Sequence, residues 1–221
     1  MLSQNIDASK DASGNAVSSF TPISEFSGKF DGMFYEVRNL KISTSENAGL
    51  FASTKGGARI ENLGVTGANV STSGSRKCYA GAIVGDAVNT TIQNVYSETL
   101  TGSDGTVIGG VSGTIAGGLV GRLGSGSTVK SSYNASPVTL KSNGHGAGVV
   151  GYLDGGSIED AYNTGAVTGS TTNNNFGIAY IGSNGGTATR VYNTYDNLKL
   201  LSGSTAANSG FTVNDSTIDT L

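Results

Sequence analysis

The feature that most constrains the fold of this sequence is a degenerate repeat of about 30 residues, in which each copy carries an apolar pair between small residues. The five copies of this first landmark are Gly49-Leu50-Phe51-Ala52, Ala82-Ile83-Val84-Gly85, Gly118-Leu119-Val120-Gly121, Gly148-Val149-Val150-Gly151 and, most divergent, Ala179-Tyr180-Ile181-Gly182. A unit this short cannot bury its own apolar face, so successive copies must stack on one another.

Each copy contains three short apolar stretches separated by Gly, Asn, Ser and Asp, residues that tolerate sharp turns. No stretch has helical periodicity. We therefore predict an all-β fold, a right-handed parallel β-helix (β-solenoid) of about six coils. It would form one structural domain, with an N-terminal capping segment at 1–36, repeats at 37–196 and a C-terminal capping segment at 197–221.

The N-terminal capping segment is rich in phenylalanine. Of the seven phenylalanines in the chain, four fall in this segment: Phe20, Phe26, Phe30 and Phe34. A solenoid must cover its open ends to avoid strand-to-strand polymerisation. We expect these rings to form a hydrophobic plug over the first coil.

A second landmark of six positions, as in Ile92-Gln93-Asn94-Val95-Tyr96-Ser97, follows the apolar pair. The composition of each position across the copies predicts which side chains are buried. Position one is apolar except in the last copy: Val37, Ile60, Ile92, Val129, Ile158 and Ala188. Position three is too polar for a core: Asn39, Asn62, Asn94, Ser131, Asp160 and Arg190. Position four is small to medium and mostly apolar: Leu40, Leu63, Val95, Ser132, Ala161 and Val191. Strict alternation would bury position three, so the pattern predicts a bend or bulge there.

Two columns of side chains follow from that register. Position five would stack Tyr96, Tyr133, Tyr162 and Tyr192 as a stripe on the outer surface, whereas position six would stack Asn134, Asn163 and Asn193 inward as a structural amide ladder. Without the bend, the rings would instead face the core. An exposed stripe could bind sugar rings or the apolar edge of a partner, or it could simply stabilise the sheet by cross-strand stacking.

Composition excludes several classes of site. Charged residues make up 13% of the chain and the net charge is −3, so nothing favours nucleic acid as a partner. No segment has the roughly 18–20 apolar residues of a membrane span, so we expect no membrane insertion. With one histidine and one cysteine, a His/Cys metal cluster is excluded, and we expect neither metal nor cofactor.

Catalytic residues are not expected either. His145 lies between glycines, where a solvent-exposed turn histidine is the plain interpretation. Parallel β-solenoids can host glycan-cleaving carboxylate pairs from neighbouring coils. Here the residues in register are Glu61, Gln93, Lys130 and Glu159, a solvated face of mixed charge. Asp154 and Asp160 fall at turns or edges, where Asp is expected for conformational reasons.

The Gly-Leu-Val-Gly element at 118–121, followed by Ile-Gln-Asn-Val-Tyr-type segments as at 92–96, resembles the GLUG motif of large bacterial surface proteins. Such proteins include filamentous-haemagglutinin-like adhesins and the non-catalytic regions of some secreted IgA peptidases. The segments at 20–32 and 37–42 also resemble the lead-in to such repeats, so the resemblance covers roughly residues 20–200. It implies export and a role in adhesion or display, and it implies no catalytic residue.

The leading hypothesis is thus a non-catalytic repeat segment of a secreted or cell-surface bacterial adhesin, excised from a larger protein. It would act as a rigid stalk or ligand-presenting surface, monomeric, with host glycans or cell-surface proteins as partners. The alternative is a carbohydrate-active β-helix enzyme or its glycan-binding accessory domain. An ice-binding solenoid would need a regular threonine array, whereas the threonines of this chain do not keep one register.

Overall fold

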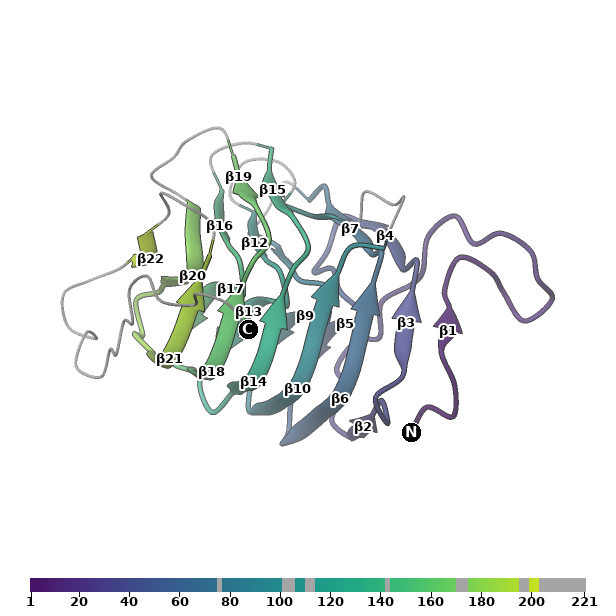
Figure 1. The fold of residues 1–221 in the computed structure, drawn as a ribbon, viewed down its shortest axis with the longest axis horizontal. Coiled ribbons are helices and arrows are strands. Elements are labelled where there is room, and N and C mark those ends of the chain that lie inside the picture. The colour runs from purple at the N-terminus through teal and green to yellow at the C-terminus, as the bar shows by residue number, and fades with distance from the viewer. Residues whose placement is uncertain are drawn as a thin grey trace.

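The computed structural model describes residues 1–74, 77–100, 106–109, 114–141, 144–169, 175–194 and 199–202. Over these residues every regular element is a β-strand, and the strands form three parallel sheets that wrap around one apolar core (Figure 1). No helix long and apolar enough to cross a membrane occurs in this part of the chain.

Sheet 1 contains β1 (Ile6–Asp7), β2 (Lys29–Asp31), β3 (Glu36–Arg38), β6 (Ala58–Thr66), β10 (Thr90–Glu98), β14 (Thr128–Asn134), β18 (Ser157–Asn163) and β21 (Thr187–Asn193). Sheet 2 contains β4 (Lys41–Thr44), β7 (Asn69–Thr72), β11 (Thr106–Gly109), β15 (Val138–Leu140) and β19 (Val167–Thr168). Sheet 3 contains β5 (Phe51–Thr54), β8 (Tyr79–Ala80), β9 (Val84–Ala87), β12 (Ile115–Gly117), β13 (Val120–Gly124), β16 (His145–Ala147), β17 (Val150–Asp154), β20 (Asn175–Ile181) and β22 (Lys199–Ser202).

One coil consists of a strand in sheet 1, a strand in sheet 2 and two strands in sheet 3, after which the chain returns to sheet 1 one step further along. In Figure 1 the sheet 1 strands β3, β6, β10, β14, β18 and β21 lie side by side in chain order. The predicted all-β solenoid of about six coils is therefore confirmed.

The bend predicted at position three is also confirmed. Each sheet 1 strand from β6 to β21 has a left-handed residue at that position, with φ between 48° and 55°: Asn62, Asn94, Ser131, Asp160 and Arg190. The ladder skips this residue, since Ile92 pairs with Ile60 and Gln93 with Glu61, and pairing resumes at Val95 and Leu63. Positions one and four of these strands consequently both point into the core.

The first coil departs from the predicted alignment. Phe30, and not Val37, pairs with Ile60, whereas Val37 pairs with Val65 further along β6. The residues between β2 and β3 take up the bend, with Met33 and Phe34 at positive φ. The alignment of Val37, Asn39 and Leu40 with the later copies was therefore wrong, because an irregular insertion separates two strands that are one strand in the other coils.

The fifth copy of the first landmark was also misplaced. Val150 pairs with Ala179, and Val149 donates its N–H to the carbonyl of Ile178, so the fifth pair is Ile178-Ala179 after Gly177. Tyr180 then follows at once, without the second glycine. In the second to fourth coils this glycine is the second residue of the second sheet 3 strand, as Gly85 in β9, Gly121 in β13 and Gly151 in β17. In the fifth coil a single continuous strand, β20, replaces the pair.

The N-terminal segment covers the first coil, although not as a plug of four rings. Phe26 and Phe30 pack on the buried Phe51, with ring centroids 4.8 and 5.4 Å away, and Phe20 lies partly buried against the core. Phe34 is 76% exposed and contributes nothing to the plug, because its left-handed backbone turns it outward. The predicted C-terminal cap at 197–221 lies outside the described residues except for β22.

Candidate functional site

The predicted tyrosines lie in one column on the outer face of sheet 1. Tyr133 pairs with Tyr96 on one side and with Tyr162 on the other, and Tyr192 occupies the next register position. The ring centroids are 5.2 Å apart for Tyr96 and Tyr133 and 4.8 Å apart for Tyr133 and Tyr162, and both pairs are parallel within 4°. Tyr162 is 39% exposed and the others are half-buried, so each ring of the column is partly accessible to solvent.

Two carboxylates hold the first two tyrosines of this column, Tyr96 and Tyr133, in place. The hydroxyl of Tyr96 donates to Glu36 at 2.7 Å, and the hydroxyl of Tyr133 donates to Glu98. Burial and these carboxylates raise the pKa of both phenols above the ordinary value, so the rings stay neutral donors. For Tyr162, burial again raises the pKa, with Glu98 as a lesser cause. Two of the rings are thus held in place by hydrogen bonds to carboxylates.

The three predicted asparagines lie inside the adjacent turn. Asn134 donates its amide N–H to Asn163 at 2.8 Å, and Asn163 donates in the same way to Asn193 at 2.8 Å. Two of them also close their own turns, since the amide groups of Asn134 and Asn163 donate to the carbonyls of Ser136 and Gly165, both at 2.8 Å. Asn134 and Asn163 are fully buried. The ladder holds the strands that carry the tyrosines in register.

The glycine before the apolar pair makes space for this ladder in the coils that contain Asn134, Asn163 and Asn193. A Cβ on Gly118 would overlap the side-chain amide of Asn134, and a Cβ on Gly148 would overlap that of Asn163. Where the repeat has Ala82 in place of this glycine, the ladder position is the smaller Ser97. The two landmarks of the repeat are therefore sterically coupled across the core.

A second aromatic cluster, which the sequence analysis did not identify, lies on sheet 3. Tyr79 and Tyr152 stack at 6.4 Å, Tyr152 and Tyr180 at 5.7 Å, and Tyr180 and His145 at 4.0 Å. The ammonium of Lys77 lies 4.2 Å from the Tyr152 ring centroid. The expectation of a solvent-exposed turn histidine was wrong, because His145 begins β16 and its unpartnered Nδ1 is buried.

An ion triad lies beside this cluster. Arg122 donates to Asp86 at 3.0 Å and binds Asp154 through two nitrogens at 3.0 and 3.1 Å. Asp154 also accepts from the backbone and side chain of Asn184. Burial raises the pKa of Asp86 and lowers that of His145, and it raises the pKa of Tyr79 to about 12. Asp154 is a buried ion-pair partner, a role that a turn preference does not explain.

The sheet 3 cluster escaped sequence reasoning because its members occupy different columns of the repeat. Tyr79 belongs to the first strand of the sheet 3 pair, whereas Arg122 and Tyr152 belong to the second. The bend between these strands brings the two columns together. Gly121 in β13 and Gly151 in β17 allow this approach, since a Cβ there would meet the backbone of Ala80 or Ala116. An alignment of the copies shows which residues stack within one column. It does not show which columns lie next to one another in space.

The remaining predicted residues form a solvated face or have plain packing roles. Glu61 forms an ion pair with Lys29 at 2.7 Å, Lys130 with Glu159 at 3.4 Å, and Asp160 with Arg190. Cys78 is a buried free thiol. Within the described ranges, no group of three His, Cys, Asp or Glu side chains is placed to hold a metal ion.

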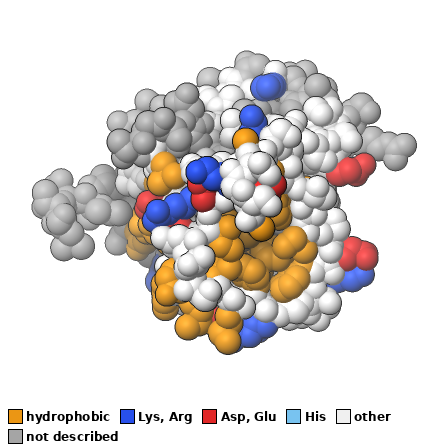
Figure 2. All heavy atoms as spheres, turned by 90° about the vertical axis from the view of Figure 1, so that its right-hand side faces the viewer, with side chains coloured by type: hydrophobic (Ala, Val, Ile, Leu, Met, Phe, Trp, Pro, Cys, Tyr) orange, Lys and Arg blue, Asp and Glu red, His pale blue; other side chains and the backbone are white. Residues whose placement is uncertain are grey.

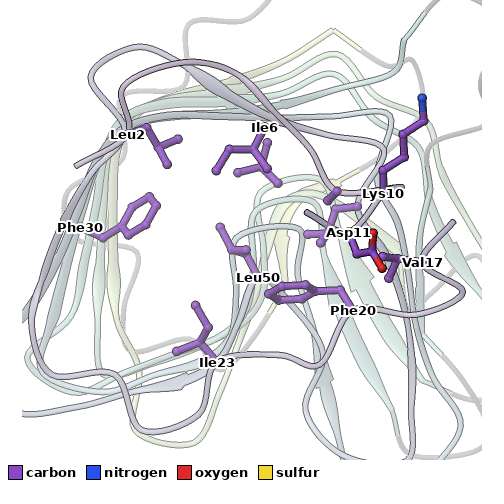
Figure 3. Close-up of a pocket in the computed structure, with 12 residues that line it drawn as sticks. Leu2, Ile6, Lys10, Asp11, Val17, Phe20, Ile23, Phe30 and Leu50 are labelled. Atoms are coloured by element: carbon purple, nitrogen blue, oxygen red, sulfur yellow. The ribbon is translucent and has the colours of Figure 1, made fainter. Parts of the chain in front are cut away.

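A third feature is an apolar hollow at the N-terminal end of the solenoid. Of the eight large hydrophobic side chains exposed in the described part of the chain, six lie in residues 1–36, so this end is the apolar one. Figure 2 shows hydrophobic side chains gathered there. The hollow has a volume of about 390 Å³, and its walls include Leu2, Ile6, Phe20 and Leu50 (Figure 3).

Two solved structures are similar to this chain at low sequence identity. No family model and no curated protein matches the chain. A crystal structure of a Bacteroides ovatus protein, described as a candidate immunoglobulin A1 protease, is 19% identical, with a TM-score of 0.45 over 74% of this chain and 68% of that chain. A structure named IgA1 protease is 14% identical, with a TM-score of 0.47 over 83% of this chain and 17% of that chain. Neither likeness identifies a site.

Proposed function

We propose that this chain is a non-catalytic repeat segment of a secreted or cell-surface bacterial protein of the adhesin type. The solenoid acts as a rigid support, and the tyrosine column on sheet 1 is the surface that contacts a host glycan or cell-surface protein. The observation that carries this proposal is the column itself. Neighbouring coils contribute parallel rings, and one of them, Tyr162, is 39% exposed.

The chemistry of the column suits a carbohydrate or an apolar peptide edge. Tyrosine offers apolar ring surface together with a polar hydroxyl, and it contributes contact area at low cost in conformational entropy. The carboxylates of Glu36 and Glu98 and the amide ladder beneath the turn restrict the rings further. A ligand therefore meets a surface that is already ordered, which lowers the entropic cost of binding.

The ion triad is consistent with a non-catalytic role. A glycosidase needs one carboxyl group as acid and a second as base or nucleophile. Asp86 and Asp154 both approach Arg122, and Asp154 accepts four hydrogen bonds from Arg122 and Asn184. Both carboxylates are thus engaged in ion pairs with the same guanidinium group.

A glycan array and a cell-adhesion assay test the proposed contact surface. We expect the protein to bind a subset of immobilised oligosaccharides or cultured host cells, and Tyr162→Ala with Tyr133→Ala to reduce that binding at least tenfold. The matched control is Tyr152→Ala, which removes a stacked tyrosine from the opposite aromatic cluster. If all variants bind equally and their circular dichroism spectra are unchanged, the tyrosine column is not the contact surface.

The enzyme alternative is tested separately by a polysaccharide turnover screen. The non-catalytic proposal expects no reducing ends to be released above background. Cleavage that Asp86→Asn abolishes would establish a glycan-cleaving activity and overturn it.

A further inference from the structure

The hollow at the N-terminal end is a gap inside the covering layer and not an uncovered sheet edge. β1 pairs with β3 at the edge of sheet 1, and Phe20 donates its N–H to the carbonyl of Lys41 on β4 at 2.7 Å. On sheet 3, Ile23 bridges to Phe51. All three sheets thus have a backbone partner at this end. A further coil added by strand pairing is therefore not the occupant that this geometry favours.

The walls of the hollow are formed mainly by apolar side chains. They include Leu2, Ile6, Phe20, Ile23, Phe30 and Leu50, whose side chains point toward a shared space in Figure 3. Backbone groups around it are already bonded, as Leu2 donates to Asp31 at 3.0 Å and Ile23 to Leu50 at 3.0 Å. A group that occupies the hollow needs to form no hydrogen bonds with its walls, so an aliphatic or aromatic group fits there.

The size of the hollow fits a small molecule. A volume of about 390 Å³ lies within the range of roughly 300–1,000 Å³ that small-molecule sites usually have. Ile6 and Ile23 stand at its rim, 41% and 38% exposed, so the hollow is open and a ligand can enter.

One positive charge stands at the rim. The stem of Lys10 lines the hollow, and its ammonium points away from the apolar walls in Figure 3. Within the described residues, Lys10 makes no ion pair shorter than 4.0 Å. The adjacent Asp11 carboxylate accepts from the backbone of Ser13 and Asn15 and from the Asn15 amide, so it is turned to its own loop. An anionic head group at the rim would complement Lys10.

We propose that this hollow is a binding site for a free single-chain amphiphile with a carboxylate head, the aliphatic chain lying among the apolar walls and the carboxylate at Lys10. The site is independent of the tyrosine column, which lies on the outer face of sheet 1, so either can fail without the other.

Displacement of a fluorescent probe tests the site. N-phenyl-1-naphthylamine should brighten on addition of the protein, and dodecanoate below its micelle concentration should displace it. Across hexanoate, octanoate and decanoate, affinity should rise about fourfold for each added methylene, the value for burying one CH₂ from water. Affinity that does not depend on chain length would overturn an apolar chain site.

Variants locate the site. Ile23→Asp places a charge in the wall, and we expect at least a tenfold loss of dodecanoate affinity. Val88→Asp is the matched control, since Val88 is also 38% exposed and is not part of the hollow, and it should bind as the unsubstituted protein does. Val17→Trp, at a half-buried position in the wall, should fill the hollow and also reduce binding. It provides a second test in case Ile23→Asp does not fold. Full binding by Ile23→Asp and Val17→Trp would overturn the proposal.

Charge at the rim is tested by head-group exchange. Lys10→Glu should weaken dodecanoate severalfold and strengthen dodecyltrimethylammonium, while probe binding stays unchanged. If the preference between the two amphiphiles stays the same, Lys10 is not part of the site. Co-sedimentation with vesicles of phosphatidylcholine and phosphatidylglycerol, without displacement of the probe by dodecanoate, would point to a membrane surface and overturn the proposal of a free ligand.

Discussion

At the scale of single residues, the left-handed position of each sheet 1 strand decides which side chains are buried. A left-handed conformation costs an L-residue about 1–2 kcal/mol, least for Gly, Asn and Asp. The repeat has Asn62, Asn94 and Asp160 there, but also Ser131 and Arg190. Composition alone predicted the bend, because positions one and four are both apolar, and two residues three positions apart cannot both face inward in an alternating strand.

A substitution at Ser131 tests this cost. Ser131 is exposed, so Ser131→Val loses little packing, yet a β-branched residue is strongly disfavoured at φ 48°. We expect the free energy of unfolding in urea to fall by more than about 1 kcal/mol. The control is Lys130→Val, one residue earlier in extended backbone, where the change should stay within about 0.5 kcal/mol. Equal effects would mean that the bend carries no conformational cost.

The steric coupling between glycine and asparagine predicts non-additive substitutions. Gly118→Ala crowds the carbonyl of Gly148 and the amide of Asn134, and Asn134→Ser relieves the second contact while it removes an amide from the buried ladder. Each single substitution should lower the free energy of unfolding by about 1–3 kcal/mol. The double variant reproduces the Ala82 and Ser97 pair found one coil earlier. Its loss should be smaller than the sum by about 0.5–3 kcal/mol, measured as a double-mutant cycle. Strict additivity would contradict the coupling.

At the scale of elements, the sheet 3 cluster makes stability depend on pH. Burial lowers the pKa of His145 below 6.5, so the unfolded chain binds a proton more readily than the folded one. The free energy of unfolding should therefore fall as the pH drops from 7.5 to 5.5. His145→Phe keeps the ring stacked on Tyr180 and should reduce that slope, because it has no proton to bind. An identical slope in both proteins would show that other groups cause the dependence.

The strands of coils two to four were predictable in register because their landmarks repeat with little change, as Ile92, Val129 and Ile158 illustrate. The first and fifth coils were not. Val37 lies after an insertion, and the fifth coil lacks one glycine, so spacing misplaced both. The tyrosine column followed from one column of the repeat, whereas the contact of Tyr79 with Tyr152 depends on the bend of sheet 3, which no spacing encodes.

At the scale of the whole molecule, the N-terminal segment covers the edges of three sheets at once. A solenoid is stabilised by contacts between neighbouring coils, and its uncovered end presents unpaired backbone groups that can pair with another chain. β1, Phe20 and the segment from Ile23 to Phe26 each bond to a different sheet of the first coil. The expectation of a monomer therefore depends on this segment.

Removing residues 1–28 should convert the chain from a monomer to a concentration-dependent oligomer. The deletion uncovers β3, β4 and β5 together and removes Phe26, one of the two rings that pack on Phe51. Sedimentation velocity at two protein concentrations checks this, with circular dichroism to show that the β-structure remains. The control is Phe34→Ser, which alters an exposed ring of the same segment and leaves the edges covered, so it should stay monomeric. A folded, monomeric truncated chain would show that the sheet edges of the first coil do not need the N-terminal segment to resist self-association.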